Sequence, residues 1–250
     1  MLEGPVRHLV RGRKAPPAGA GLAIALAALL VAYGNLVSLS PAEVRQRFDW
    51  AYILGNLAMM ALLLAWAKWC WRLSPLAIGL TRRRAVRSAL QGSALAALVS
   101  VPVVLFFAFP LVVEEPIQYE AAEEMSVGGF LLWALLKQPL GTALFEEVAF
   151  RGVLQARLTE VLSLRRGIAA TAFAFALWHL VINYRTIQET NVGDSAALAA
   201  LAQAGSLAGL FVGGLFLSLL RHYTGNLAGP IAFHWLVVVA MTGSLFALAR

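Results

Sequence analysis

Long apolar stretches recur along the whole of this 250-residue chain. Several of them reach the about 20 residues that an α-helix needs to cross the hydrocarbon core of a bilayer. Only 13% of the residues are charged and 60% are hydrophobic, whereas soluble domains are about 25% charged. A chain that crosses lipid has to satisfy its own backbone hydrogen bonds, which helices do. The sequence therefore predicts an all-α fold, a polytopic transmembrane helical bundle with about seven to eight spans.

The predicted spans lie at about 20–39, 50–71, 88–113, within 127–158, and at 167–184, 196–223 and 227–248. A cleavable signal peptide is the alternative interpretation of the first stretch. Lys137 and Pro139 interrupt the fourth, which raises the alternative of a separate interfacial or re-entrant helix at 127–138. In the sixth, glycines at every fourth position from Gly205 to Gly213 predict a close-packing ridge between helices.

Charge is distributed unevenly between the loops. The formal net charge of +7 comes almost entirely from arginines that flank apolar spans, so the positive-inside rule explains it without a nucleic-acid partner. The arginine-rich loop 72–87 is expected inside and the acidic loop 114–124 outside. We divide the chain into a basic cytoplasmic tail (1–19), N-terminal transmembrane helices (20–126) and a motif-bearing core (127–250). The expected location is the cytoplasmic membrane of a bacterium or archaeon, with the N-terminus inside and the lipid bilayer as a partner.

Two adjacent carboxylates interrupt the fourth apolar stretch. Glu147 and Arg151 are spaced i and i+4, close enough to pair on one helix face, while Glu146 points about 100° away. Ionisable groups at membrane depth cost at least ~2.5–3.5 kcal/mol each, so such residues are functional candidates. The alternative is a surface ion pair at a cytoplasmic helix end. His179 and His234, inside two later spans, favour the intramembrane interpretation.

Counting along the helices places these groups at similar depths. Glu146 lies twelve residues before the turn at about Leu158, and His179 lies twelve residues after Gly167. At 1.5 Å per residue both are about 18 Å from the same turn. His234 is about 10 Å from the same side, within the uncertainty of helix ends. The three side chains can therefore converge in one intramembrane pocket.

Such a pocket suits hydrolysis. A carboxylate and a neutral imidazole can hold a water and take its proton, and a second histidine can donate a hydrogen bond to the oxyanion that forms. The cofactor is left open between none and a divalent metal such as zinc, with Glu146, His179 and His234 as candidate ligands. The sequence contains no His-Glu-x-x-His motif, and with Cys70 as its only cysteine it cannot form a thiolate metal cluster.

Three motifs in order resemble the CAAX-protease and bacteriocin-processing family of intramembrane proteases. That family includes the type II CAAX prenyl endopeptidases and bacterial abortive-infection-like membrane proteins. The resemblance covers roughly residues 127–240, and its motifs are Glu146-Glu147-x-x-x-Arg151, Phe175-x-x-x-His179, and His234 after a Gly-rich span and Thr224-Gly225-Asn226.

The resemblance implies an intramembrane endopeptidase that acts on a peptide or lipidated protein substrate. The implied roles are the water-activating glutamate for Glu146, its partner for His179, an oxyanion-side group for His234, a site-shaping pair for Glu147 and Arg151, and a packing residue for Phe175.

One position departs from the family pattern. The last motif usually places asparagine four residues after the final histidine, and here that residue is Val238. Loss of one oxyanion donor costs about 10²–10³ in turnover in a well-studied hydrolase. Asn183, one turn beyond His179, is a candidate substitute. Val238 also favours an alternative, a non-catalytic membrane immunity or peptide-interaction protein on the same scaffold. A small proton-relaying transporter is a third possibility, although no inverted repeat is detectable.

Overall fold

The computed structural model describes residues 18–40, 50–109 and 116–250. The predicted all-α bundle is confirmed for this part of the chain, where six helices are long and apolar enough to span a membrane, or seven if one bent pair counts as a span. Residues 1–17 of the expected tail, and Glu114 and Glu115 of the expected acidic loop, lie outside the described residues.

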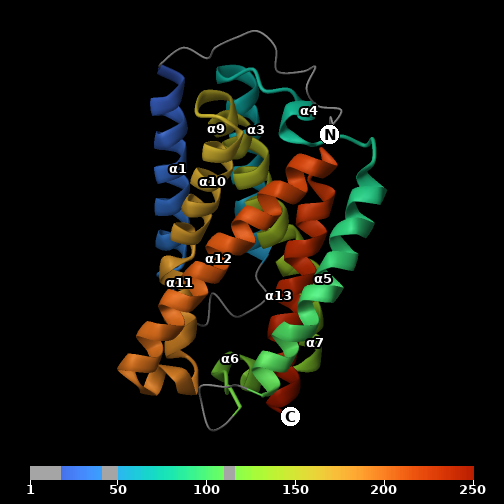
Figure 1. Cartoon of the computed structure of the whole chain (residues 1–250). Helices are drawn as coiled ribbons and strands as arrows, with labels where there is room; N and C mark the ends of the chain where they lie inside the picture. Colours follow the sequence, from blue (N-terminus) through green and yellow to red (C-terminus); the bar gives the residue numbers. More distant parts are fainter. Residues whose placement is uncertain (1–17, 41–49, 110–115) are drawn as a thin grey trace.

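The bundle is built from long helices joined by short segments (Figure 1). In chain order the elements are α1 (Ala18–Val37), α3 (Trp50–Cys70), α4 (Pro75–Ile78), α5 (Ala85–Ala108), α6 (Glu120–Glu124), α7 (Val127–Leu132), η1 (Trp133–Ala143), α8 (Leu144–Glu147), η2 (Val148–Leu154), α9 (Gln155–Val161), α10 (Leu164–Trp178), α11 (Leu180–Gln188), η3 (Asn191–Asp194), α12 (Ala196–Thr224) and α13 (Ala228–Leu248).

The five elements from α7 to α9 form one continuous helix of 35 residues, Val127–Val161. The suggested separate helix at 127–138 is therefore wrong. Pro139 lies inside η1, which has π-helical geometry, and the Leu144 N–H donates to the Pro139 carbonyl five residues earlier. A π-turn contains one more residue than an α-turn. It can therefore accommodate proline, which has no backbone N–H to donate, without ending the helix.

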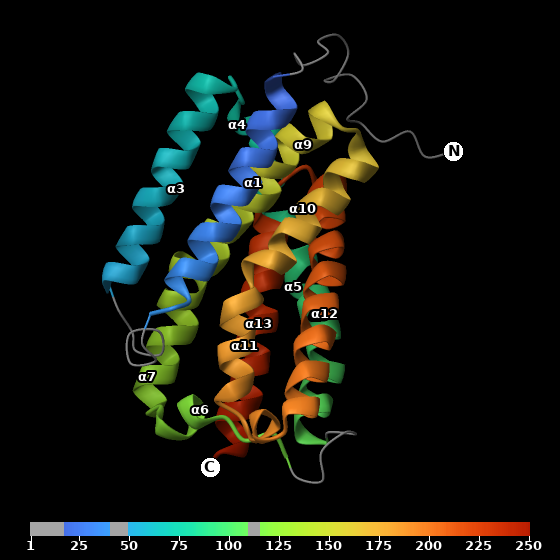
Figure 2. The same ribbon diagram turned by 90° about the vertical axis from the view of Figure 1, so that its left-hand side faces the viewer.

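This continuous helix runs through the middle of the bundle (Figure 2). Its η2 segment contacts α1, α3, α10 and α12, and every residue from Phe145 to Leu154 is buried. The main hydrophobic core is built around that segment, with Phe150 packed edge-on against the rings of Phe175 and Trp178. The most deeply buried stretch of the chain is thus the one that carries the paired glutamates.

The span expected at 167–184 is bent by 40° where α10 ends and α11 begins, at His179. A bend frees backbone groups that need partners. Asn35 of α1 supplies them: its Nδ2 donates to the Leu177 carbonyl at 2.9 Å, and its Oδ1 accepts from the Val181 N–H at 2.9 Å. A neighbouring helix therefore stabilises the break beside the histidine.

Close helix approaches depend on glycines, but not on the expected ones. A Cβ added at Gly92 of α5 would lie 2.1 Å from the Gly229 carbonyl oxygen of α13, so these helices touch through their backbones. The predicted ridge from Gly205 to Gly213 is wrong among the described residues, none of which has an atom within 4 Å of a Cβ built at its three glycines. The contact face of α12 instead passes through Gly214, which packs on α10.

Candidate active site

Glu146 and Glu147 lie side by side in α8, and both are buried, at 5% and 0% exposure. Successive helix residues point in different directions, so the two carboxylates serve different surroundings. Glu147 faces the interior of the bundle. Glu146 faces a large cavity.

Glu147 is held by two partners. Its Oε1 accepts from Arg151 Nη1 at 2.9 Å and lies 2.9 Å from His234 Nδ1. The Arg151 guanidinium lies over the ring of Phe175, 3.8 Å from its centroid. Arg151 and the side chain of Glu147 are almost wholly shielded from solvent. The sequence-predicted pair therefore forms inside the bundle, and it fixes His234 as well.

Glu146 faces both histidines. Its Oε2 lies 3.6 Å from His179 Nε2 and 3.9 Å from His234 Nε2, and it has no hydrogen-bond partner among the described residues. Its other oxygen, Oε1, accepts from the Trp178 indole N–H at 3.3 Å. The structure thus brings the three candidate catalytic residues together.

Hydrogen bonds on the far side of each ring indicate the histidine tautomers. His179 Nδ1 lies 2.8 Å from the Phe175 carbonyl oxygen, which only accepts, so Nδ1 carries the proton. His234 Nδ1 faces the Glu147 carboxylate, which also accepts. In the neutral form each ring therefore turns an unprotonated Nε2 toward Glu146. The Glu146 carboxylate and the Nε2 atoms of His179 and His234 are then three hydrogen-bond acceptors that face one another.

The cavity in front of Glu146 has a volume of about 1000 Å³. Its walls come from α1, α3, α5, α11, α12, α13 and η1, and they are mostly apolar. Glu146, His179, Asn183 and Val238 line it, whereas His234 does not. Asn183 also donates from Nδ2 to Ser206 Oγ at 2.6 Å, so one of its two amide N–H groups is already engaged.

Several polar residues of the cavity wall were not identified from the sequence. Tyr52 lies 3.3 Å from Thr142 Oγ1 through its hydroxyl, and Asn56 donates to the Gly141 carbonyl at 2.7 Å. Lys137 is buried, lines the same cavity and lies 5.1 Å from the Tyr52 ring centroid. A buried lysine in a spanning helix is a signal that the sequence does contain. The tyrosine and asparagine of α3 carry none, because only folding brings them here.

No group of three or more His, Cys, Asp or Glu side chains in the described residues has the arrangement of a metal site. The candidate set Glu146, His179 and His234 is close together, but the Nδ1 atoms of its two rings are engaged by Phe175 and Glu147. The donors that remain are one carboxylate oxygen and two ring nitrogens, and a zinc site could use that set only with the rings in their present tautomers.

Comparison with known proteins gives one finding. Residues 128–240 match a family model described as Rce1-like, type II CAAX prenyl endopeptidase Rce1-like. The matched segment begins at α7, ends inside α13 and contains all three motifs, so the resemblance seen in the sequence is confirmed over this segment. No curated protein and no solved structure gave a significant match.

Proposed function

We propose that this chain is an intramembrane endopeptidase, and the match of residues 128–240 to the Rce1-like type II CAAX prenyl endopeptidase model supports the proposal. It hydrolyses a peptide bond of a membrane-associated substrate. Glu146 and His179 activate the attacking water, and the substrate is a peptide or a lipidated protein that enters the cavity from the bilayer.

One observation carries this proposal. Glu146 Oε2 and His179 Nε2 face each other at 3.6 Å, and both are acceptors when the imidazole is neutral. Glu146 is buried and His179 is only partly exposed, so two acceptors at that separation call for a donor between them, and a water can give one O–H to each. The oxygen of that water is then a nucleophile whose proton Glu146 can take. Trp178 holds the other carboxylate oxygen and so orients Glu146.

The cavity supports the choice of substrate. Its volume of about 1000 Å³ holds several residues of extended chain, and its apolar walls suit a segment drawn from lipid. An apolar site also strengthens the electrostatic interactions that act on a developing oxyanion.

His234 has a conditional role. With its Nδ1–H donated to Glu147, a neutral His234 has no N–H on the Nε2 that faces Glu146. It can donate from Nε2 only as an imidazolium, a form that the adjacent Glu147 carboxylate stabilises. Val238 lines the cavity at the position of the missing amide donor and offers no hydrogen bond. We therefore expect slow turnover.

The test compares wild type with Glu146→Gln in an assay of membrane-tethered peptides. The amide keeps the shape of the side chain but cannot accept the proton, so cleavage should be lost while peptide binding and thermal stability stay unchanged. Glu160→Gln, which changes a half-exposed carboxylate away from the cavity, is the matched control. Undiminished cleavage by Glu146→Gln would refute the assigned base. Inhibition by chelators that zinc reverses would replace the metal-free mechanism.

A non-catalytic function is the second candidate, and Val238 is the observation that favours it. In that case the same cavity binds a peptide without cleaving it, as an immunity or interaction protein would. Tight peptide binding with no cleavage by wild type or by Val238→Asn would support this function.

A further inference from the structure

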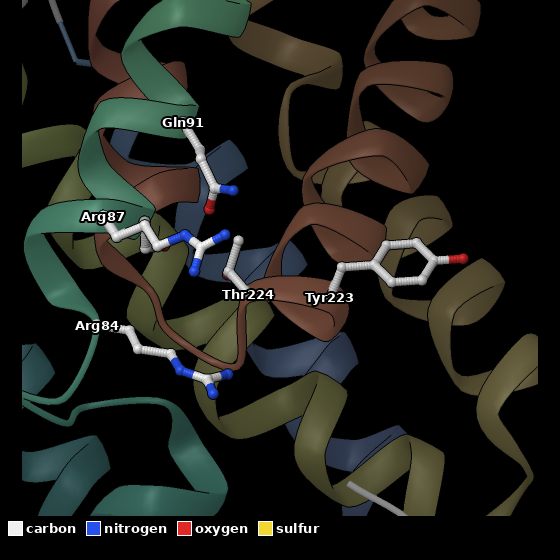
Figure 3. Close-up of a pocket in the computed structure, with 6 residues that line it drawn as sticks. Arg84, Arg87, Gln91, Tyr223 and Thr224 are labelled. Atoms are coloured by element: carbon white, nitrogen blue, oxygen red, sulfur yellow. The ribbon is translucent and has the colours of Figure 1, made fainter. Parts of the chain in front are cut away.

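A second, smaller cavity lies where α5 begins and α12 ends. It has a volume of about 160 Å³, and its lining residues are Arg84, Arg87, Ser88, Gln91, Tyr223 and Thr224. Figure 3 shows the guanidinium groups of Arg84 and Arg87 extending toward Thr224, whereas the ring of Tyr223 points away. This cavity shares no lining residue with the one in front of Glu146.

The backbone around this cavity is fixed by contacts between distant segments. The Asn226 amide donates to the carbonyl oxygens of Thr81 and Arg83, at 2.7 and 3.2 Å. The Leu227 N–H donates to the Gly79 carbonyl at 3.0 Å. These bonds tie the loop before α5 to the turn between α12 and α13. The two arginines therefore extend from a fixed frame.

Arg84 has a left-handed backbone conformation, with φ at 61°. Residues other than glycine adopt it uncommonly, and it is stable only where the surroundings impose it. Here Arg84 is also the N-cap residue of α5, and a guanidinium, which has no acceptor, cannot cap a helix N–H. Its guanidinium is instead directed into the cavity.

The cavity concentrates positive charge. Within the described residues, the side chains of Arg84 and Arg87 form no hydrogen bond or ion pair, and no acidic residue lines the cavity. The first turn of α5 adds the partial positive charge of a helix N-terminus. Two guanidinium groups three residues apart on one helix end repel each other, and an anion between them would turn that repulsion into attraction.

We propose that this cavity binds a phosphate group, which Arg84 and Arg87 hold with Gln91 beside it. Guanidinium groups match phosphate oxygens in geometry as well as charge. The apolar surface beside the cavity favours the headgroup of a phospholipid over free phosphate. Val86 and Leu90 of α5 are 76% and 66% exposed, and Leu219 of α12 is 40% exposed. Both helices are candidate membrane spans with one end at this cavity, so we expect the cavity to lie at the level of the lipid headgroups.

The experiment titrates the full-length protein in detergent with phosphatidylglycerol, phosphatidylcholine or inorganic phosphate, with bound species counted by native mass spectrometry. We expect phosphatidylglycerol to bind most tightly, and the double variant Arg84→Gln/Arg87→Gln to weaken its binding about tenfold or more. Arg165→Gln/Arg166→Gln is the control, because it removes the same charge from exposed residues outside the cavity. The control pair should bind as wild type does.

Arg87→Lys separates geometry from charge. Lysine keeps the positive charge but lacks the planar guanidinium. If the geometry of Arg87 matters, this variant should bind phosphatidylglycerol several-fold more weakly. Circular dichroism and thermal unfolding without lipid check that each variant is folded. The proposal would be overturned if both double variants weakened phosphatidylglycerol binding equally. It would also be overturned if neither Arg87→Lys nor Arg84→Gln/Arg87→Gln changed that binding. Inorganic phosphate that binds as tightly as the lipid, and is lost in the same variants, would identify free phosphate as the ligand.

Discussion

Removal of the Arg151 charge should destabilise the whole bundle. Arg151 and Glu147 pair at 2.9 Å with both side chains at 0% exposure, so Arg151→Met leaves a carboxylate buried without its cation. Breaking one side of a buried pair typically costs about 3–5 kcal/mol. The contact of the guanidinium with the Phe175 ring, at 3.8 Å, adds about 0.5–2 kcal/mol. Methionine fills much of the vacated volume, which keeps the cost of a cavity small.

The double variant Glu147→Gln/Arg151→Met shows whether the charge is the cause. Glutamine can still accept from His234, so removing both charges should restore part of the lost stability. We expect a coupling free energy of about 2 kcal/mol or more, within the range of contacting residues. Glu160→Gln is the control. Its carboxylate pairs with Arg157 at 2.6 Å but is 35% exposed, and its loss should cost about 0–1 kcal/mol.

The assay is the free energy of unfolding in mixed detergent, followed by circular dichroism. A loss below about 1 kcal/mol for Arg151→Met, equal to that of Glu160→Gln, would refute the reasoning. It would mean that Glu147 is already neutral or that water reaches the pair. Additive single variants would refute it too, because they would show that the two side chains do not interact.

Three further predictions concern the cavity and its orientation in the membrane. Val238→Asn should raise the cleavage rate by about tenfold or more, since it adds a donor at the cavity wall, and steady-state kinetics on a tethered peptide measures this. Trp178→Phe should lower kcat several-fold with little change in KM, because the freed Oε1 of Glu146 no longer fixes the orientation of the base. In a Cys70→Ser background, a cysteine at Glu120 should react with an impermeant reagent from outside intact cells, and labelling only after permeabilisation would reverse the proposed orientation.

Much of the candidate site followed from helix geometry. Two helices joined by a tight turn are level with each other at equal distances from it, so counting from the turn placed Glu146 opposite His179. The i, i+4 rule paired Glu147 with Arg151 in the same way. Such inferences succeed because they depend only on the rise and rotation of a helix. The catalytic roles of these residues stay predictions.

The features that were missed or wrong depend on contacts between distant segments. Asn35 of α1 stabilises the break at His179 through two hydrogen bonds, and no local sequence pattern predicts them. The local rule for proline predicted that the helix is interrupted near Pro139, but π-helical geometry at that point lets the helix continue. The bond from Asn183 to Ser206 on α12 also depends on the fold, and the suggested role of Asn183 as a substitute donor stays a prediction.

π-Helical turns lie on both sides of Glu146 and Glu147, so the number of residues in these turns decides which side chains of the helix face the cavity. A π-turn is an α-helix with one residue added, and each residue turns a helix by about 100°. Deleting one residue from η1 should rotate the part of this helix before the deletion relative to α8, and a different set of its side chains would then face the cavity. The glutamates and the two histidines would stay in place. Evolution can therefore change what this protein accepts by a single-codon insertion or deletion, without any substitution at the site itself.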